Sequence, residues 1–326
     1  MLEDRYGRRF RYLRLSVTDV CNFRCSYCLP SGYQAPAGGV PDSFLGADEV
    51  AVIVAAFARL GTSKIRLTGG EPGLRADLPE LIRICKSTDG IRTVALTTNG
   101  YRLPQQIGDW HHAGLDRLNV SIDSLDAGEV DRITGHDRLP VILAGLDRAL
   151  ALGFQNIKIN AVLLREGHAE RMQQFIHWLR DTPVTLRFIE LMQTGDNSVF
   201  FRDQHLRGLE MLAMLVEQGW RESPRADDAG PARELFHPDY AGRIGFIMPY
   251  SSDFCTSCNR LRVSALGKLH LCLFADQGHD IRQWCRDGDV DGLMLRLQQL
   301  IGDKGESHLL QHQHTGATRH FAMIGG

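Results

Sequence analysis

The sequence has little net charge, which narrows the kinds of partner it can bind. Lysine and arginine together number 37 against 39 aspartate and glutamate residues, so the formal net charge is -2. Proteins that bind nucleic acids or anionic membranes by general electrostatic attraction need a broadly basic surface. We therefore expect neither kind of partner, and we expect any strong positive charge to be local.

Long apolar runs are also missing. The first 17 residues, MLEDRYGRRFRYLRLSV, contain no apolar segment like the core of a secretion signal, and no later stretch approaches 18 apolar residues. We therefore expect a cytoplasmic protein. In that reducing compartment, the eight cysteines are not expected to form a disulfide framework, and those that cluster indicate metal or redox ligands.

Strand and helix patterns alternate along the chain, with no short-period repeat or low-complexity tract. Strand patterns occur at residues 13–18, 64–70, 92–100, 117–124, 156–164 and 185–192, and helical patterns such as residues 47–61 lie between them. This alternation indicates the α/β class with a parallel sheet. It stops after about residue 195, so we predict two units, residues 1–194 and residues 195–326.

The strand patterns are polar on one face and apolar on the other. Lys64, Arg66 and Thr68 alternate with Ile65 and Leu67, and residues 117–123 and 156–160 alternate in the same way. Unpaired buried charges are costly, so the polar face must line a cavity or meet solvent. An incompletely closed TIM-type barrel with a polar lumen fits this pattern. An antiparallel sheet with one solvated face is the alternative.

Three cysteines, Cys21, Cys25 and Cys28, directly follow the first strand, where α/β folds place functional loops. Structural zinc usually takes four protein ligands, whereas a four-iron cubane held by three cysteines leaves one iron open. No histidine lies within CNFRCSYC to complete a zinc site. The spacing therefore favours an iron–sulfur cluster over zinc.

A second trio, Cys255, Cys258 and Cys272, lies near the C-terminus. His270 is two residues before Cys272, and on a strand both side chains would share a face. A zinc site with His270 as the fourth ligand and an open iron–sulfur cluster are therefore both compatible with this spacing.

The motif Cys21-x3-Cys25-x2-Cys28, with an aromatic residue at Tyr27 and TGGEP at residues 68–72, resembles the radical S-adenosylmethionine (SAM) superfamily. The segments LRLSVTDVCNFRCSYCLP, KIRLTGGEP, TTNGYRL, LRFIELM and CNRLRVS, and the terminal Gly325-Gly326, narrow the resemblance to its GTP-cyclising family of molybdenum-cofactor biosynthesis. The resemblance runs from about residue 10 to the C-terminus. It implies an incomplete (βα)6 barrel, closed by a C-terminal extension, with one 4Fe-4S cluster at each end of the lumen.

The resemblance also implies an activity. One electron enters the N-terminal cluster, and SAM breaks to methionine and a 5′-deoxyadenosyl radical. This radical removes the C3′ hydrogen of GTP, and C3′ then bonds to guanine C8 to give a 3′,8-cyclic dihydro-GTP. The implied partners are a low-potential electron donor of flavodoxin or ferredoxin type and a MoaC-like cyclic pyranopterin monophosphate synthase that consumes the product. We expect a monomer or a homodimer.

Residue by residue, the resemblance assigns two ligand sites. The SAM site comprises Tyr27, Gly70, Glu71, Ser121 and Met192. The GTP site comprises Arg14, Arg66, Thr97, Lys158, Arg187, Arg260, Leu261 and Arg262. Catalytic roles fall to Arg260, Arg262, Gly325 and Gly326, because the family's tail reaches into the active site and glycine allows close approach of its backbone. The cations independently suit a triphosphate, since arginine offers bidentate hydrogen bonds to phosphate.

Simpler interpretations remain for these residues. Any single arginine or lysine could form a surface salt bridge, and Thr97 and Ser121 could be ordinary strand residues. Arg187 has the opposite strand parity from Glu190 and Met192 unless a bulge intervenes. For the whole chain, the alternatives are a radical SAM enzyme that modifies a peptide and a zinc-stabilised binding module without catalysis.

Overall fold

The fold is built on one curved sheet. The computed structural model describes residues 1–35, 44–224, 230–312, 314–316 and 318–325. Its 12-stranded sheet has the order β12-β11-β10-β1-β2-β3-β4-β5-β6-β9-β8-β7. The central parallel strands are β1 (Tyr12–Thr18), β2 (Lys64–Gly69), β3 (Thr93–Thr98), β4 (Arg117–Ser121), β5 (Lys158–Leu163) and β6 (Thr185–Glu190). These are the strands expected from the sequence, and their parallel pairing contradicts the antiparallel alternative.

The C-terminal half extends this sheet at both edges. Strand β9 (Arg243–Ile247) pairs in parallel with β6, and β10 (Arg260–Val263) pairs in parallel with β1. Antiparallel strands follow outside them, β8 (Arg233–Phe236) and β7 (Arg221–Glu222) on one side and β11 (Lys268–His270) and β12 (His279–Asp280) on the other. The strand order has two ends, so this is the incompletely closed barrel that the sequence predicts.

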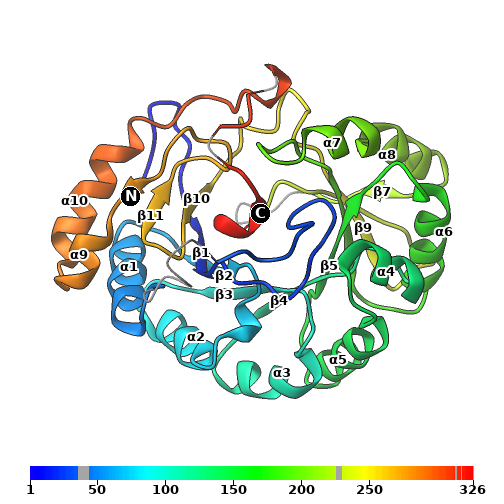
Figure 1. Cartoon of the computed structure of the whole chain (residues 1–326), viewed down its shortest axis with the longest axis horizontal. Helices are drawn as coiled ribbons and strands as arrows, with labels where there is room; N and C mark the ends of the chain where they lie inside the picture. The colour runs from blue at the N-terminus through cyan, green and yellow to red at the C-terminus, as the bar shows by residue number, and fades with distance from the viewer. Residues whose placement is uncertain (36–43, 225–229, 313, 317, 326) are drawn as a thin grey trace.

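Helices surround the barrel. Those that connect the central strands are α1 (Ala47–Arg59), α2 (Leu78–Ser87), α3 (Leu103–His112), α4 (Ala127–Thr134), α5 (Leu139–Ala151) and α6 (His168–Leu179), with a short η1 (Pro72–Leu74). Later elements are α7 (Ser198–Gln204), α8 (Gly208–Glu217), α9 (Arg282–Arg286), α10 (Val290–Ile301), η2 (Leu310–His312) and η3 (Phe321–Met323). Most lie around the outside of the sheet, while the red C-terminal segment lies in the middle (Figure 1).

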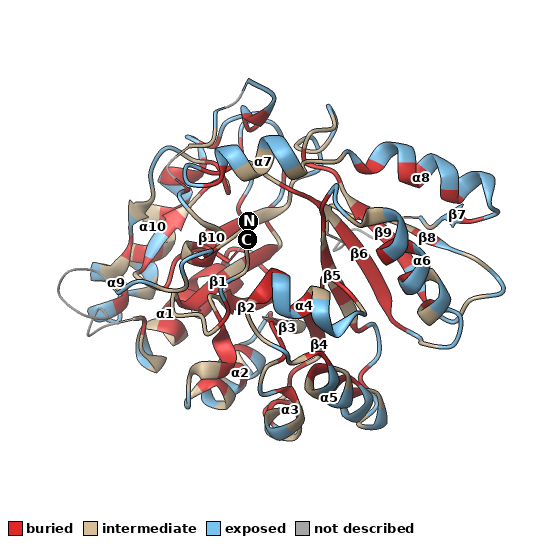
Figure 2. Cartoon of the chain, turned by 45° about the vertical axis from the view of Figure 1, so that its right-hand side comes forward, coloured by how far each residue is buried: buried red, intermediate tan, exposed pale blue. Residues whose placement is uncertain are grey.

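The hydrophobic core lies between the sheet and these outer helices. Helix α1 buries Val50, Ile53, Val54 and Phe57, whose i, i+3, i+4, i+7 spacing forms one face of a helix. The apolar strand residues that alternate with the polar ones are completely buried, among them Leu13, Leu15, Ile65, Leu67, Leu118 and Val120. Each buried aliphatic side chain contributes about 1.5–3 kcal/mol. The apolar faces therefore point outward to the helices, and Figure 2 shows most of the central strand residues as buried.

The sheet runs continuously across the expected boundary near residue 194, so the division into two units stays a prediction. Within the described residues, no helix has the length and apolar character needed to cross a membrane.

Candidate active site

The polar strand faces line a cavity of about 400 Å³ inside the barrel, which we call the cationic cavity. Arginine and lysine dominate its charged lining, and Glu222 and Glu234 are the acidic residues that the described part of the lining includes. Its cations are Arg14, Lys64, Arg66, Arg117, Lys158, Arg187, Arg233, Arg243, Arg260, Arg262 and Lys304. Every cation assigned to GTP from the sequence is in this set. These side chains therefore line an internal cavity rather than forming salt bridges on the outer surface.

Three of these cations are held largely away from water. Arg66, Arg187 and Arg262 are each 6% exposed. Burial lowers the pKa of Arg66 and of Arg187 to about 10, and burial with the charges of Arg14 and Arg260 lowers the pKa of Arg262 to about 9. Concentrated, poorly solvated positive charge is stabilised by an anion that hydrogen-bonds to it. The cavity therefore suits a polyanion such as a triphosphate.

Neighbouring polar groups orient several of these side chains. Arg66 Nη1 donates to Thr97 Oγ1 at 3.2 Å. Arg187 donates through Nε and Nη2 to Asn160 Oδ1, at 3.1 and 2.7 Å. Arg187 and Met192 have opposite strand parity, but β6 ends at Glu190, so strand alternation does not apply to Met192. Both Arg187 and Met192 line the cavity.

Lys158 has an acidic partner in the cationic cavity. Its Nζ lies 2.6 Å from Glu234 Oε1. Burial and the charge of Arg187 lower the pKa of Lys158 to about 8, although Glu234 opposes this shift. An entering phosphate would compete with Glu234 for this lysine.

Tyr12 is a residue of this cavity that sequence reasoning missed. It lies on β1, two residues before Arg14, and is 4% exposed. Burial opposes its ionisation, but the charges of Arg66, Arg14, Lys64 and Arg187 outweigh that effect and lower the pKa of Tyr12 to about 7. Its shared parity with Arg14 was the sequence signal that could have identified it.

The C-terminal cysteine trio lines the same cavity. Cys255, Cys258 and Cys272 are all half-buried there. Burial opposes ionisation of Cys258, but the positive charges of Arg260 and Lys304 outweigh it and lower the pKa of this thiol to about 6. These cations thus favour the thiolate of Cys258, the form that binds metal. His270, the candidate fourth ligand, has its ring beside Gly278.

The N-terminal cysteine trio lines a second cavity of about 170 Å³, which we call the small cavity. Tyr27, Gly70, Ser121 and Met192 also line it, so the structure brings together the predicted SAM residues except Glu71. The two cavities adjoin, because the described linings share Asn160, Ile189 and Met192.

Helix α4 holds the loop that carries the N-terminal trio. The backbone N–H groups of Arg24 and Ser26 donate to the carbonyls of Thr134 and Ile133, both at 2.9 Å, at the C-terminal end of this helix. His136 Nε2 lies 2.7 Å from the carbonyl oxygen of Asn22. The cysteine loop is therefore fixed by backbone contacts along one side.

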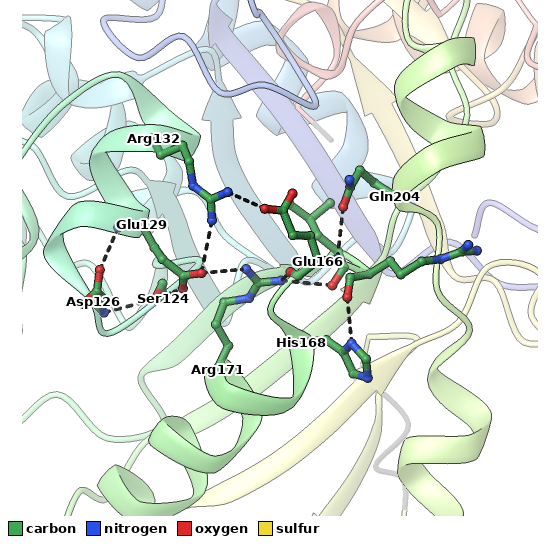
Figure 3. A network of polar contacts seen from close by, with 10 residues as sticks. Ser124, Asp126, Glu129, Arg132, Glu166, His168, Arg171 and Gln204 are labelled. Carbon is green, nitrogen blue, oxygen red and sulfur yellow. Dashed lines mark hydrogen bonds and ion pairs between the residues drawn. The ribbon is translucent and has the colours of Figure 1, made fainter.

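A polar network fixes α4 in turn (Figure 3). Glu129 of α4 accepts hydrogen bonds from Ser124 Oγ at 2.7 Å and from Arg171 Nη1 at 3.3 Å. Arg171 is 4% exposed and also donates to the carbonyl oxygens of Leu164 and Glu166. This network ties α4 to the segment between β5 and α6.

Two consecutive glycines bring the end of β2 against the start of the cysteine loop. A Cβ atom on Gly69 would lie 2.1 Å from the carbonyl oxygen of Thr18, and one on Gly70 would lie 2.3 Å from that of Val20. Gly69 also has φ +142°, which disfavours other residues. The TGGEP segment thus requires glycine for close backbone packing.

Glu71 lies outside the lining of the small cavity and is 2% exposed. Its carboxylate accepts hydrogen bonds from the N–H of Gly73 at 2.8 Å, Thr98 Oγ1 at 2.6 Å and the N–H of Asn99 at 2.6 Å. Burial raises the pKa of Glu71. This carboxylate therefore joins the ends of β2 and β3 beside the small cavity.

Carboxylates rather than cations surround the small cavity. Asp123 accepts hydrogen bonds from Tyr27 Oη and from the N–H of Val162, both at 2.8 Å. Burial raises the pKa of Cys21 to about 12 and that of Cys28 to about 11. The two trios therefore offer the same donor atoms in opposite electrostatic surroundings.

The C-terminal tail lies where the two cavities meet. Its carbonyl oxygen at Gly325 accepts hydrogen bonds from Arg14 Nε at 3.0 Å and Nη2 at 2.6 Å. Gly325 has φ +60°, and a Cβ atom there would lie 2.2 Å from Thr68 Cγ2. Phe321 and Ala322 line the small cavity. Gly326 lies outside the described residues.

Leu261 differs from the other residues assigned to GTP. Its side chain is 1% exposed and belongs to the hydrophobic core, on the face of β10 opposite Arg260 and Arg262. Any ligand contact of Leu261 would therefore be made by its backbone.

Comparison with known proteins identifies the family. Residues 15–179 match the radical SAM superfamily, and residues 184–310 match the family described as Molybdenum Cofactor Synthesis C. A GTP 3′,8-cyclase of Vibrio cholerae is 50% identical over 325 residues, which cover 99% of this chain and 97% of the relative. One of Stenotrophomonas maltophilia is 55% identical over 326 residues, which cover 100% of this chain and 99% of the relative. The chain belongs to the GTP 3′,8-cyclase family.

Solved structures show how widely this fold is shared. Streptococcus suis SuiB bound to S-adenosylmethionine has a TM-score of 0.62 at 13% identity, covering 90% of this chain and 68% of that one. Native anSMEcpe with bound AdoMet and a peptide has a TM-score of 0.55 at 14% identity, covering 89% and 83%. At these identities the likeness establishes the radical SAM fold alone.

Membership of this superfamily implies a 4Fe-4S cluster and SAM, and the three thiols that line the small cavity suit the cluster. Cys21, Cys25 and Cys28 enter it from one loop, which leaves one corner of a cubane without a protein thiol. Among the described residues, no three histidine, cysteine or acidic side chains are grouped closely enough to hold a single metal ion. Each trio consists instead of separate thiols around a cavity.

Proposed function

We propose that this chain converts GTP to (8S)-3′,8-cyclo-7,8-dihydroguanosine 5′-triphosphate, the first step of molybdenum cofactor biosynthesis, with SAM as the radical source. The observation that carries this proposal is the meeting of two unlike cavities inside one barrel. The small cavity holds the radical SAM cysteines, and the adjoining cationic cavity suits a triphosphate. The full-length relatives named GTP 3′,8-cyclase support the same substrate.

When bound, the N-terminal 4Fe-4S cluster and SAM would supply the 5′-deoxyadenosyl radical that removes the ribose C3′ hydrogen. The chain's own part is to position the reactants and exclude water, which would otherwise quench a radical. Tyr27, Gly70, Ser121 and Met192 would hold SAM in the small cavity. Glu71 would act as a positioning residue, because its carboxylate is already engaged by the backbone.

The cationic cavity would bind the triphosphate through side chains from several strands. Arg66, Lys158 and Arg187 lie on β2, β5 and β6, so together they would contact the phosphates from three strands. Guanidinium groups give directional, charge-assisted hydrogen bonds to phosphate oxygens. Thr97 would contribute by orienting Arg66.

We further propose a second 4Fe-4S cluster at Cys255, Cys258 and Cys272, with its open corner toward the guanine. The cations around Cys258 favour the thiolate form that such a cluster needs. Arg260 and Arg262 lie beside this trio and beside the tail-bound Arg14. In this proposal, the catalytic arginines would lie between the guanine end of the substrate and the radical source.

The tail would complete the reaction site. Gly325 is held by Arg14, and glycine is the residue that fits against Thr68 there. Gly326 is proposed to extend the same contact. Loss of both glycines is expected to leave SAM cleavage and to abolish cyclisation.

Several finer points belong to the same proposal. A flavodoxin- or ferredoxin-type protein would deliver two electrons, one to cleave SAM and one that, with a proton, reduces the nucleotide radical left after C3′ bonds to C8. A MoaC-like synthase would consume the product, and the protein would work in the cytoplasm as a monomer or a homodimer. The relatives do not favour the peptide-modifying or zinc-binding alternatives.

Anaerobic reconstitution tests the proposal. The protein is supplied with iron, sulfide, SAM, GTP and a strong reductant, and both 5′-deoxyadenosine and the nucleotide product are quantified. We expect a 3′,8-cyclic nucleotide in proportion to deoxyadenosine. Deoxyadenosine without any nucleotide product, or a colourless protein that holds zinc and no acid-labile sulfide, would reject it.

A further inference from the structure

Residues 2–10 form a small hairpin beside the C-terminal half of the barrel, which we call the N-terminal hairpin. The N–H of Phe10 donates to the carbonyl oxygen of Leu2 at 3.0 Å, and Glu3 and Arg9 form an antiparallel bridge. Leu2 and Phe10 are each 1% exposed. The sequence pattern gave this segment no role, and neither ligand site described above uses it.

The hairpin contains a buried ion pair between Asp4 and Arg8. Arg8 Nη2 lies 2.7 Å from Asp4 Oδ2, and the two residues are 7% and 6% exposed. Asp4 Oδ1 also accepts hydrogen bonds from the N–H groups of Tyr6 and Arg8, both at 3.0 Å. Burying an ion pair costs desolvation free energy. The pair is therefore stable only if the remaining N–H groups of Arg8 also form hydrogen bonds.

The remaining N–H groups of Arg8 donate to backbone carbonyls at and near the C-terminal trio. Its Nη1 donates to the carbonyl oxygen of Cys255 at 3.1 Å and to that of Glu306 at 2.6 Å. Its Nη2 donates to the carbonyl oxygen of Gly305 at 2.6 Å. One guanidinium group therefore joins the loop of Cys255 to the segment that follows α10.

A second contact links the same elements. Lys304 Nζ lies 5.4 Å from the centre of the Phe10 ring and donates to the carbonyl oxygen of Leu271, the residue before Cys272. Lys304 is 4% exposed and lines the cationic cavity. The hairpin thus contacts the surroundings of the trio at both Cys255 and Cys272.

The segment that Arg8 holds presents another polar group to the cavity. His308 lines the cationic cavity and is 8% exposed. Its Nε2 is buried without a hydrogen-bond partner among the described residues. A buried polar atom of this kind is costly unless a ligand or water satisfies it, which makes the position of residues 304–308 relevant to what the cavity binds.

We propose that Arg8 is a positioning residue for the C-terminal cysteine trio and, through residues 304–308, for the nucleotide beside it. The proposal rests on the proposed function for the identity of the nucleotide. Arg8 touches backbone carbonyls, so it sets the separation of two loops without contacting a ligand. Arginine suits this role because its planar fork presents several donors in fixed directions, which the single ammonium of lysine cannot reproduce.

Replacing Arg8 tests the proposal, with Arg9→Met as the matched control. Arg9 is the adjacent residue, and its side chain is 56% exposed in a surface pair with Glu3. Arg8→Met, Arg8→Lys and Arg9→Met are each reconstituted anaerobically, both in the full chain and in a background with the N-terminal cysteines changed to serine. The readouts are iron per chain, the electron paramagnetic resonance (EPR) spectrum of each cluster, SAM cleavage without GTP, and equilibrium binding of GTP.

We expect Arg8→Met to reduce iron at the C-terminal trio or to weaken GTP binding by about 10-fold or more, which corresponds to 1.4 kcal/mol. The EPR signal intensity of the N-terminal cluster and the rate of SAM cleavage should stay within about 2-fold of the values for the unchanged chain. Arg8→Lys should retain part of the lost iron or affinity, and Arg9→Met should match the unchanged chain.

Equal losses at both clusters would assign Arg8 a general role in stability and overturn the proposal, as would unchanged iron and GTP affinity. If Arg8→Met does not fold, Arg8→Lys decides by the same comparison between clusters. The iron and EPR readouts need no cyclisation. A chain that makes no cyclic nucleotide would therefore reject the proposed function while leaving the role of Arg8 measurable.

Discussion

The two cysteine trios offer the same number of thiols in opposite surroundings. At the small cavity, burial raises the pKa of Cys21 to about 12, and the carboxylates of Asp123 and Glu190 are nearby. At the cationic cavity, burial acts on Cys258 as well, but Arg260 and Lys304 lower the pKa of that thiol to about 6. The difference arises from neighbouring charges rather than from the cysteines.

This contrast indicates what each trio is built to accept. SAM carries a sulfonium cation, which carboxylates tolerate, whereas GTP carries several negative charges, which a dense group of cations requires. The ligand that binds at the open corner of a cluster depends on the charges of the surrounding side chains. We therefore expect the surrounding charges to decide which ligand binds at which trio.

The largest expected effect separates the two trios directly. Cys21→Ala should abolish SAM cleavage and therefore cyclisation, because the proposed radical source loses a ligand. Cys255→Ala should abolish cyclisation but keep 5′-deoxyadenosine formation measurable. Quantifying both products for each variant checks this division, and equal loss of both products in the two variants would break the comparison.

The tail between the cavities gives the next effect. Gly325→Ala places a Cβ atom 2.2 Å from Thr68 Cγ2 at φ +60°, which costs about 2–4 kcal/mol unless the tail moves away from Arg14. We expect cyclisation to fall by about 30-fold or more while deoxyadenosine still forms. The control is Gly288→Ala, where φ is +68° and nothing lies within 4 Å. Similar losses in both variants would show that backbone strain alone is responsible.

Removing one cavity cation should affect one ligand only. Arg187→Met removes charge-assisted hydrogen bonds worth about 1.5–3 kcal/mol, so GTP should bind about 10- to 150-fold more weakly. SAM affinity, measured on the same protein, should not change. Arg148→Met, an exposed position on α5, is the control. Weaker binding of both ligands would contradict the separation of the two cavities.

The smallest expected effect is a pH dependence. Burial lowers the pKa of Lys158 to about 8, so the ligand-free cavity loses this positive charge as the pH rises through that value. GTP affinity should therefore decline, by up to about 4-fold, between about pH 7 and pH 8.5. Lys158→Arg keeps its charge over this range and should flatten the profile above about pH 7.5, where Tyr12, whose pKa is lowered to about 7, is already largely ionised. An equally steep decline in that variant would assign the titration to another group.

The sequence predicted the parts of this molecule that follow from local patterns. The parallel barrel followed from strand and helix periodicity, and the inward cations Arg66 and Lys158 followed from strand parity. Glu71 was assigned to the ligand, yet its carboxylate is engaged by the backbone of Gly73 and Asn99. That distinction depends on how β2 and β3 end in space, which spacing along one chain does not contain.

Long-range contacts account for the features that were missed. Strands β9 and β10 are short, and pairing with β6 and β1 rather than a strong pattern of their own determines them. Arg8 contacts residues more than 200 positions away in sequence, so no local motif could link it to Cys255. Tyr12 is polar only at its hydroxyl group, and its role depends on the cations that fold around it.

The most direct test of two open clusters with separate ligands is EPR spectroscopy of the reduced, anaerobic protein, with each cluster assigned from variants that lack one cysteine trio. We predict that SAM changes the spectrum of the cluster at Cys21, Cys25 and Cys28, and that GTP changes the spectrum of the cluster at Cys255, Cys258 and Cys272. A GTP-induced change at the N-terminal cluster, or no change at either cluster when GTP is added, would contradict the account.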